Sequence, residues 1–313
     1  MITALAGGVG AARFLSGLVR VVSEKELVVV VNTGDDIGLY GLHVSPDIDT
    51  VTYTLAGVVD EAKGWGIKED TFHCLEMLRS FGYETWFNLG DKDFATHLHR
   101  TSLLRRGLKL SEATAEMCRV FGLKVRVLPM TDDSFETWVQ TEAGLMHFQE
   151  YMVKRGAKDA VSSVKLIGVE TAAPAPGVID SILESQLVIV CPSNPIVSIG
   201  TILSIRGVRE ALERSSARKI AISPIVAGAP LKGPADKLMK GLGLEVSAYS
   251  VAHLYRDFLD TFVLDVADEN EKERIEELGI KVVVANTIMK TLEDKIRLAR
   301  IVVKEAQETT TFD

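Results

Sequence analysis

A buried strand, a glycine turn and a helix open this chain, and together they restrict the fold more than any other feature. Residues 2–6 are apolar, "GGVG" at 7–10 follows them, and the pattern then predicts a helix to about residue 20. The segment "ELVVVVNTGDD" predicts a second buried strand, because β-branched residues dominate it and turn formers end it. A strand, a helix and a strand in this order form a βαβ unit.

The same alternation returns in the second half of the chain. Five apolar segments there predict strands separated by helices, namely "KLIGV", "LVIVCPS", "KIAISPI", "TFVLDV" and "IKVVVA". Before them, we expect a mostly helical insertion at about 60–125 and, from alternating apolar and polar residues, a β-hairpin at about 134–153. We therefore predict a single Rossmann-like α/β domain over residues 1–313, with a doubly wound, largely parallel sheet.

The composition limits the classes of partner. With 35 basic and 43 acidic residues the formal net charge is −8, which argues against a broad basic surface for nucleic acid. No apolar run reaches the roughly 18 residues of a membrane span. The three cysteines are scattered, which excludes a disulfide framework. We therefore expect a cytoplasmic enzyme or ligand-binding protein with neither a nucleic-acid nor a membrane partner.

The glycine turn is a candidate phosphate site. Gly7, Gly8 and Gly10 lie where backbone N–H groups at a helix start bind anions. The alternative is a tight turn that needs glycine only for a positive φ. A standard dinucleotide fingerprint has a third glycine where this chain has Arg13, and the second strand ends in Asn32 instead of an acid. Hydride transfer with a nicotinamide cofactor is therefore disfavoured.

A second candidate site is "SPDIDT" at residues 45–50. Pro46 fixes the turn, and in a turn that enters a helix Asp47 and Asp49 can converge on one cation. The alternative is that Asp49 only caps the following helix. Two more carboxylates, in "TGDD" at 33–36, follow the second strand at the sheet edge where ligands bind.

A late loop, "CPSNPIVSIG" at 191–200, repeats the pattern of the glycine turn. A buried strand ends there, and Ser193, Asn194 and Ser198 offer hydrogen bonds to a ligand near the start of a helix. The alternative is an ordinary capped loop between a strand and a helix.

The polar segment "LGDKDFATHLHRT" at 89–101 predicts a solvated helix. His97 and His99 are two positions apart, so they point about 200° apart on a helix and cannot share a metal ion. Further along, His147 shares a face with Gln149, which is more often a structural pair than a site. The candidate substrate contacts from these segments are Lys92, Arg100, His147 and Arg155.

In their order along the chain, ten blocks resemble the CofD-type 2-phospho-L-lactate transferases of deazaflavin coenzyme F(420) biosynthesis. The blocks are "GGVGAARF", "VVVNTGDD", "SPDIDTV", "WGIKEDTF", "LGDKDFATH", "PMTDD", "MHFQEYMVKR", "PSNPIVSIG", "SPIVAGAPLKGPA" and "DFLDTFVLD". They lie between residues 5 and 265, which is most of the chain.

This resemblance implies a Rossmann-like fold, a homodimer and a Mg²⁺-dependent reaction. In the family, lactyl-2-diphospho-5'-guanosine is the guanylylated phospholactate donor. Its 2-phospholactyl group moves to the ribityl hydroxyl of the deazaflavin Fo, which forms a phosphodiester and releases GMP.

The resemblance also implies a role for each candidate residue. Asp47 and Asp49 are expected to be catalytic and to bind Mg²⁺, which prefers carboxylate and phosphate oxygens. In the family, the counterpart of Asp49 and a basic residue just before the "LGD" block are associated with Fo. The latter position is Asn88 here, and Lys92 is a substitute for it. The residues expected to bind the donor nucleotide and its phosphates are Gly7, Gly8, Gly10, Asn32, Ser193, Asn194 and Ser198.

Two other functional classes stay open. A branch similar to the bacterial gluconeogenesis-factor proteins shares the glycine turn and the "DD" block, and its members are thought to be nucleotide-sugar-binding regulators. The "SPDIDT" and "HFQEYMVKR" blocks favour the transferase instead. A dehydrogenase would require NAD(P)H binding. The sequence leaves open whether the acid is phospholactate or phosphoenolpyruvate, and which of Asp47 and Asp49 is the base.

Overall fold

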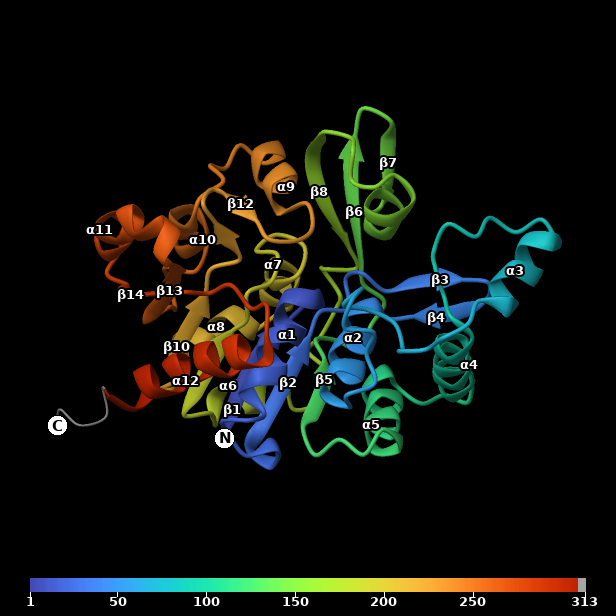
Figure 1. The fold of residues 1–313 in the computed structure, drawn as a ribbon, viewed down its shortest axis with the longest axis horizontal. Helices are drawn as coiled ribbons and strands as arrows, with labels where there is room; N and C mark the ends of the chain where they lie inside the picture. The colour runs from blue at the N-terminus through green and yellow to red at the C-terminus, as the bar shows by residue number, and fades with distance from the viewer. Residues whose placement is uncertain (309–313) are drawn as a thin grey trace.

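Seven parallel strands form one sheet at the centre of the protein (Figure 1). The computed structural model describes residues 1–308. The strand order is β14-β13-β10-β9-β1-β2-β5, and each neighbouring pair is parallel. The strands are β1 (Ile2–Ala6), β2 (Leu27–Val31), β5 (Arg126–Pro129), β9 (Leu187–Val190), β10 (Arg218–Ile222), β13 (Thr261–Asp265) and β14 (Lys281–Ala285). The predicted Rossmann-like α/β class is confirmed.

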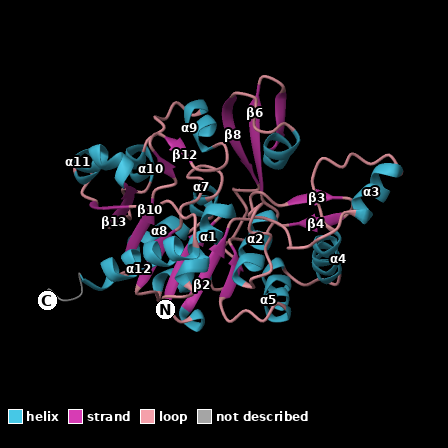
Figure 2. Ribbon diagram, in the orientation of Figure 1, coloured by secondary structure: helices cyan, strands magenta, loops and turns pink. Residues whose placement is uncertain are grey.

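Helices cover both faces of this sheet, which explains why its strands are mostly apolar (Figure 2). Alternate residues point to opposite faces: Leu5 and Val30 belong to one core, whereas Ala4 and Val29 belong to the other. The helices of the second core are α1 (Gly8–Leu18), α2 (Pro46–Leu55), α5 (Leu110–Val120) and α12 (Leu292–Glu308). Those of the first are α6 (Val178–Leu183), α7 (Ile199–Ser204), α8 (Val208–Arg214), α9 (Ala235–Gly241), α10 (Ala248–Leu254) and α11 (Lys272–Glu276).

The strand order reverses beside β1, and this places two loops next to each other. From β1 the chain adds β2 and β5 on one side, and from β9 it adds β10, β13 and β14 on the other. The connections that leave β1 and β9 therefore diverge at adjacent strand ends. In open α/β sheets a ligand crevice forms at such a switch point.

A small antiparallel sheet lies beside the central one. β6 (Glu136–Thr141) and β7 (Gly144–His147) form a hairpin, and β8 (Val161–Ile167) pairs with the other edge of β6. The segment "KLIGV" thus contributes to a strand outside the parallel sheet, whereas β5 occupies a place in that sheet where we predicted no strand. β5 has only four residues and begins with exposed Arg126, so its apolar pattern is short.

The region around 37–125 holds two small strands and the remaining helices. β3 (Ile37–Leu39) pairs with β4 (Leu42–Val44), and α3 (His73–Ser80) and α4 (Asp91–Arg105) extend away from the sheet (Figure 1). The other short elements are the 3₁₀ turns Glu24–Glu26 and Val266–Glu271, the π-helical turn Glu150–Lys154, β11 (Ile225–Val226) and β12 (Ala229–Pro230). Within residues 1–308, no helix is both long enough and apolar enough to cross a membrane.

Candidate active site

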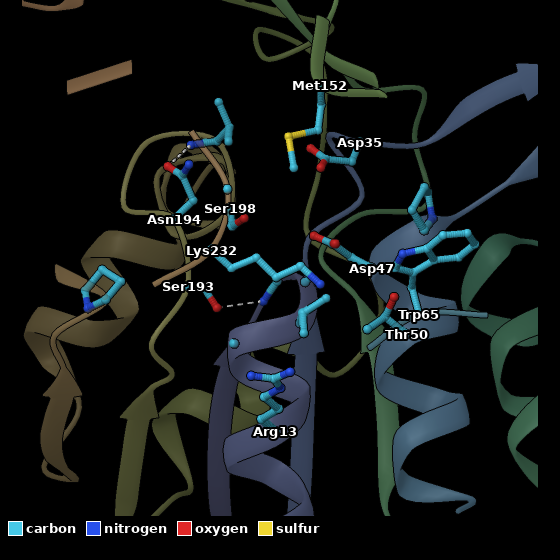
Figure 3. Close-up of a pocket in the computed structure, with 18 of the residues that line it drawn as sticks. Arg13, Asp35, Asp47, Thr50, Trp65, Met152, Ser193, Asn194, Ser198 and Lys232 are labelled. Carbon is cyan, nitrogen blue, oxygen red and sulfur yellow. Dashed lines mark hydrogen bonds between the residues drawn. The ribbon is translucent and has the colours of Figure 1, made fainter. Parts of the chain in front are cut away.

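A cavity of about 800 Å³ opens at the carboxyl ends of the central strands (Figure 3). Loops that follow β1, β2, β9, β10 and β14 line it, together with the first turn of α2. The cavity therefore lies at the switch point of the sheet, where the topology predicts a ligand site.

The glycine turn forms the floor of the cavity. Gly8 has a φ of 68°, and it is the first residue of α1, whose N-terminus has no side-chain cap. The N–H of Gly7 donates to the hydroxyl of Ser193 at 3.1 Å, so the loops after β1 and β9 are joined. The N–H of Gly8 is hydrogen-bonded to the carboxylate of Asp47, so this helix start already faces a negative group. A helix start with a positive dipole end is suited to an anion.

Glycine is required at two of these positions because other groups lie very close. A Cβ on Gly7 would lie 2.5 Å from the Cβ of Ser198, and one on Gly10 would lie 2.2 Å from the carbonyl oxygen of Pro192. The positive-φ explanation therefore applies to Gly8, whereas Gly7 and Gly10 permit the close approach of the two loops.

In the loop at 191–200, the side-chain oxygen of Asn194 is hydrogen-bonded to the backbone of the residues that follow it. Its Oδ1 accepts from the N–H groups of Ile196 at 2.9 Å and Val197 at 3.2 Å, so its amide nitrogen is the group left for a ligand. Ser193 and Ser198 line the cavity beside it.

Asn32 lies behind the cavity wall and holds two carboxylates. Its Nδ2 donates to Asp35 at 3.2 Å and to Asp47 at 2.9 Å, while its Oδ1 accepts from the backbone of Gly34 and the hydroxyl of Thr201. The side chain of Asn32 is fully buried, and it does not line the cavity. Its position indicates that it orients Asp35 and Asp47, both of which point into the cavity (Figure 3).

Asp35, Asp36 and Asp47 form a buried acidic cluster whose carboxyl groups disfavour one another's ionisation. Burial, reinforced by nearby Asp36, raises the pKa of Asp47 to about 7 despite the hydrogen bond from Asn32. Burial and the charge of Asp47 raise the pKa of Asp35 well above its usual value. Among the residues that the structure describes, one oxygen of Asp36 is buried without a hydrogen-bond partner. A cation bound at this point would relieve the repulsion.

The donor set around Asp35 and Asp47 fits Mg²⁺ rather than a metal with a full protein cage. In the described part of the chain, no group of three or more His, Cys, Asp or Glu side chains could hold a metal ion. Mg²⁺ commonly takes one or two carboxylates and completes its shell with water and substrate phosphate. Asp35 and Asp47 share one amide donor, so they are the pair able to supply those carboxylates.

Asp49 has different partners from Asp47 although both lie in the first turn of α2. Two positions on a helix are about 200° apart, so the two carboxylates leave α2 in different directions. Both oxygens of Asp49 contact the guanidinium of Arg100 on α4, with Nη1 donating to Oδ2 at 3.1 Å. The cap alternative for Asp49 is wrong, because Ser45 occupies the N-cap position.

The prediction of a solvated helix at 89–101 is wrong for one face of α4. Asp93, His97 and Arg100 are all buried on that face, whereas His99 is exposed. Their spacing of four and three residues places them together against α2. A buried face is usually recognised from apolar residues at helical spacing. The buried face of α4 is polar, so this pattern did not predict it.

Comparison with known proteins identifies the family. The sequence model of the family described as "2-phospho-L-lactate transferase CofD" matches residues 2–302. The chain belongs to the CofD family.

Its CofD relatives include proteins named for two different acids. A 2-phospho-L-lactate transferase from Methanosarcina mazei is 42% identical over 299 residues, which cover 95% of this chain and 98% of that protein. A phosphoenolpyruvate transferase from Kitasatospora aureofaciens is 43% identical over 314 residues, which cover 98% of each. A solved structure of a UPF0052-family protein from Bacillus halodurans has a TM-score of 0.63 at 15% identity, covers 96% of this chain and 98% of that chain, and shows the shared fold alone.

Within this CofD-family chain, the cavity brings together nine of the predicted site residues and excludes five. The residues that line it are Gly7, Gly8, Gly10, Asp47, Asp49, Asn88, Ser193, Asn194 and Ser198. Those that do not are Asn32, Lys92, Arg100, His147 and Arg155.

The excluded residues other than Asn32 and Arg100 have partners elsewhere. The ammonium of Lys92 donates to the carbonyl oxygens of Lys68 and Glu69 at 3.1 and 2.9 Å. Arg155 forms an exposed ion pair with Asp159. His147 is buried, and its Nε2 lies 3.1 Å from the carbonyl oxygen of Asp36. Burial lowers the pKa of His147 below its usual value.

The sequence reasoning missed two cations and an aromatic wall in the cavity. Arg13 was noted only as a departure from the dinucleotide fingerprint, and Lys232 was not singled out at all; both line the cavity near the glycine turn (Figure 3). Burial, then the charge of Arg13, lowers the pKa of Lys232. The aromatic residues that line the cavity, called here the aromatic wall, are Tyr53, Trp65, Phe87 and Phe148, and Met152 adds an apolar side chain. Trp65 and Lys232 lie within blocks that carry the family resemblance, which was the available signal.

Proposed function

We propose that this protein transfers the 2-phospholactyl group of lactyl-2-diphospho-5'-guanosine to the ribityl hydroxyl of Fo. The hydroxyl oxygen forms a bond to the lactyl phosphorus, and the bond from that phosphorus to GMP breaks. The observation that carries the proposal is the juxtaposition, in a CofD-family chain, of an uncapped helix start with a buried pair of carboxylates in one cavity.

The glycine turn and its neighbours suit the diphosphate of the donor. The N–H groups at the start of α1 bind phosphate oxygens, and the side chains of Ser193 and Ser198 lie beside them. Arg13 and Lys232 supply positive charge on the open side. Since GMP leaves as a phosphate monoester with a second pKa of about 6, it needs no general acid.

Asp35 and Asp47 would hold Mg²⁺ in this reaction. Bound Mg²⁺ supplies charge neutralisation of the transferring phosphoryl group and of the departing GMP. This assignment revises our expectation from the sequence, which paired Asp47 with Asp49. The reason is that Asp49 already forms an ion pair with Arg100, whereas the donors to Asp35 and Asp47 are neutral: the amide of Asn32 for both, with Gln149 for Asp35 and the backbone N–H of Gly8 for Asp47.

The aromatic wall suits the deazaflavin acceptor. Trp65, Phe87 and Phe148 offer apolar ring surfaces for a flat ring system, and Asn88 adds a polar group at the rim. Asp49 faces the same cavity, so its carboxylate can accept a hydrogen bond from the attacking hydroxyl. Its position beside the wall supports a role with Fo.

A direct assay tests this function. The purified protein is incubated with Fo, Mg²⁺ and either the lactyl donor or its phosphoenolpyruvyl counterpart, and the products are identified by mass spectrometry. We expect the phosphodiester of Fo together with an equal amount of GMP from the lactyl donor. Nucleotide-sugar binding without product from either donor would favour the regulator class instead. The homodimer and the cytoplasmic location stay predictions.

Guanine nucleotides should bind better than adenine nucleotides. The start of α1 explains affinity for phosphate, whereas the preference for guanine comes from the family donor. Titration calorimetry should give a lower Kd for GDP than for ADP, with NAD⁺ as a further comparison. Equal or tighter binding of ADP or NAD⁺ would contradict the proposed donor.

Turnover should require a divalent cation. The protein carries a net charge of −8 and the donor is a polyanion, so neutralisation of the diphosphate is essential. Removal of metal with a chelator should lower the rate by ~10²-fold or more, and Mg²⁺ should restore it. Elemental analysis verifies that the chelator-treated protein is free of metal. Full activity of that metal-free protein would exclude the Mg²⁺ role.

A further inference from the structure

Five buried polar residues form a network between α2 and α4. α2 contributes Asp49 and Tyr53, four residues apart, and α4 contributes Asp93, His97 and Arg100. All five are buried, and all except Arg100 line the cavity. Arg100 thus does not line the cavity, and it affects the cavity through the side chains that it contacts.

The guanidinium of Arg100 fixes the carboxylate of Asp49. It is fully buried, and its two terminal nitrogens contact the two oxygens of Asp49 in a fork. Nη1 also lies 3.4 Å from the carbonyl oxygen of His43, which anchors the group to β4. A planar fork defines the plane of the carboxylate, which a single ammonium would not do.

Arg100 also faces the ring of His97. Its Nη1 lies 3.2 Å from Nδ1 of His97, and a guanidinium has donors only. Oδ2 of Asp49 lies 3.6 Å from the same Nδ1, farther than the guanidinium. A hydrogen bond from Nη1 requires Nδ1 to accept, which places the proton of the ring on Nε2. Among the described residues, Nε2 is buried without a partner in hydrogen-bond geometry, and an oxygen of Asp93 lies 3.4 Å from it. Tyr53 donates to the same oxygen of Asp93 at 2.7 Å.

We infer that Arg100 is a positioning residue for the acceptor side of the reaction. It holds Asp49 in one orientation, so that the remaining lone pairs of the carboxylate face the cavity and align the attacking hydroxyl of Fo. It also keeps His97 as the Nε2–H tautomer. The inference rests on the proposed function. It gives the two aspartates of α2 different roles: Asp49 orients the hydroxyl of Fo, whereas Asp47 binds the metal ion.

The variant Arg100→Lys tests this role because it keeps the charge and removes the fork. We expect kcat to fall by ~10-fold or more, as small misplacements of a reacting group are costly. The Kd for GDP should stay within about twofold, because the donor site lies on the other side of the cavity. Arg105→Lys is the matched control, since Arg105 is exposed on the same helix and donates to the carbonyl oxygen of Gly41.

A double-mutant cycle separates positioning from general stability. In the Asp49→Asn background, Arg100→Lys should cause little further loss of kcat, because the group that it positions has changed. Wild-type kcat and KM in Arg100→Lys would overturn the inference, and so would losses that add fully to those of Asp49→Asn. Absence of product from the wild-type protein is a different result, and it would count against the proposed function.

Nitrogen NMR of the wild-type protein gives a readout that needs neither turnover nor a folded Arg100 variant. Among the six histidines, the signals of His97 are assigned by their loss in His97→Asn. We expect an unprotonated Nδ1 and a protonated Nε2. A proton on Nδ1 would overturn the inference, because a protonated Nδ1 cannot accept a hydrogen bond from the guanidinium of Arg100.

Discussion

Asp47→Asn should lower turnover by ~10²-fold or more and leave the metal-free protein at least as stable as the wild type. The carboxylate is buried beside Asp35 and Asp36, and it is assigned here to Mg²⁺. An asparagine has nearly the same shape, and its carbonyl oxygen can still accept from Asn32. The substitution therefore removes charge and keeps the packing.

The pH dependence of this stability effect follows from the raised pKa of Asp47, which is about 7 in the folded protein and 3.8 as a free group. Between these values the unfolded chain loses a proton that the folded protein keeps, so the wild type loses stability as the pH rises. The gain from Asp47→Asn should thus be absent below pH 3.8, grow up to about pH 7 and stay constant above it.

Thermal denaturation in a chelator across this pH range, together with the product assay, measures both effects. Asp180→Asn is the control, because Asp180 is exposed on α6. Near wild-type turnover in Asp47→Asn with Mg²⁺ present would contradict the metal assignment. A loss of stability at every pH would show that Asp47 is a structural residue.

Gly10→Ala should lower the free energy of unfolding by ~3 kcal/mol or more. The new methyl group would lie 2.2 Å from the carbonyl oxygen of Pro192, which is a backbone atom at the end of β9. It cannot turn away as a side chain would, so α1 must move from β9. Because the same movement opens the glycine turn, the affinity for GDP should fall as well.

Gly38→Ala provides a control for the loss of a glycine. Gly38 lies in β3, its φ is not positive, and a Cβ there would meet no atom within 4 Å. Urea denaturation should show a small change for Gly38→Ala and a large one for Gly10→Ala. Similar stabilities for the two variants would mean that the contact with Pro192 does not require glycine.

The central strands were predictable because their signal is local. β2 and β9 are buried along their whole length, so each is a continuous apolar run. β1 and β13 are mostly apolar, which explains why the parallel sheet followed from the sequence. The glycine turn was also visible, because its position between a strand and a helix is a matter of order along the chain.

The partners of the polar residues were not predictable in the same way. Asp47 is bound by Asn32, 15 residues away, and Asp49 by Arg100, 51 residues away. The spacing of the two aspartates is equally compatible with shared and separate partners. Only the packing of α4 against α2 places Arg100 at Asp49.

By itself, therefore, the sequence determined the parallel α/β fold, the family and the segments that line the cavity. These depend on runs of residue types and on their order, which the chain carries directly. The tertiary structure decided that Asn32 joins Asp35 to Asp47, that α4 buries a polar face, and that Arg13 and Lys232 line the cavity. Such pairings depend on distances between residues that are far apart in the sequence. A buried charge needs a hydrogen-bond or ion-pair partner, and the packing of the fold determines which group lies close enough to be that partner.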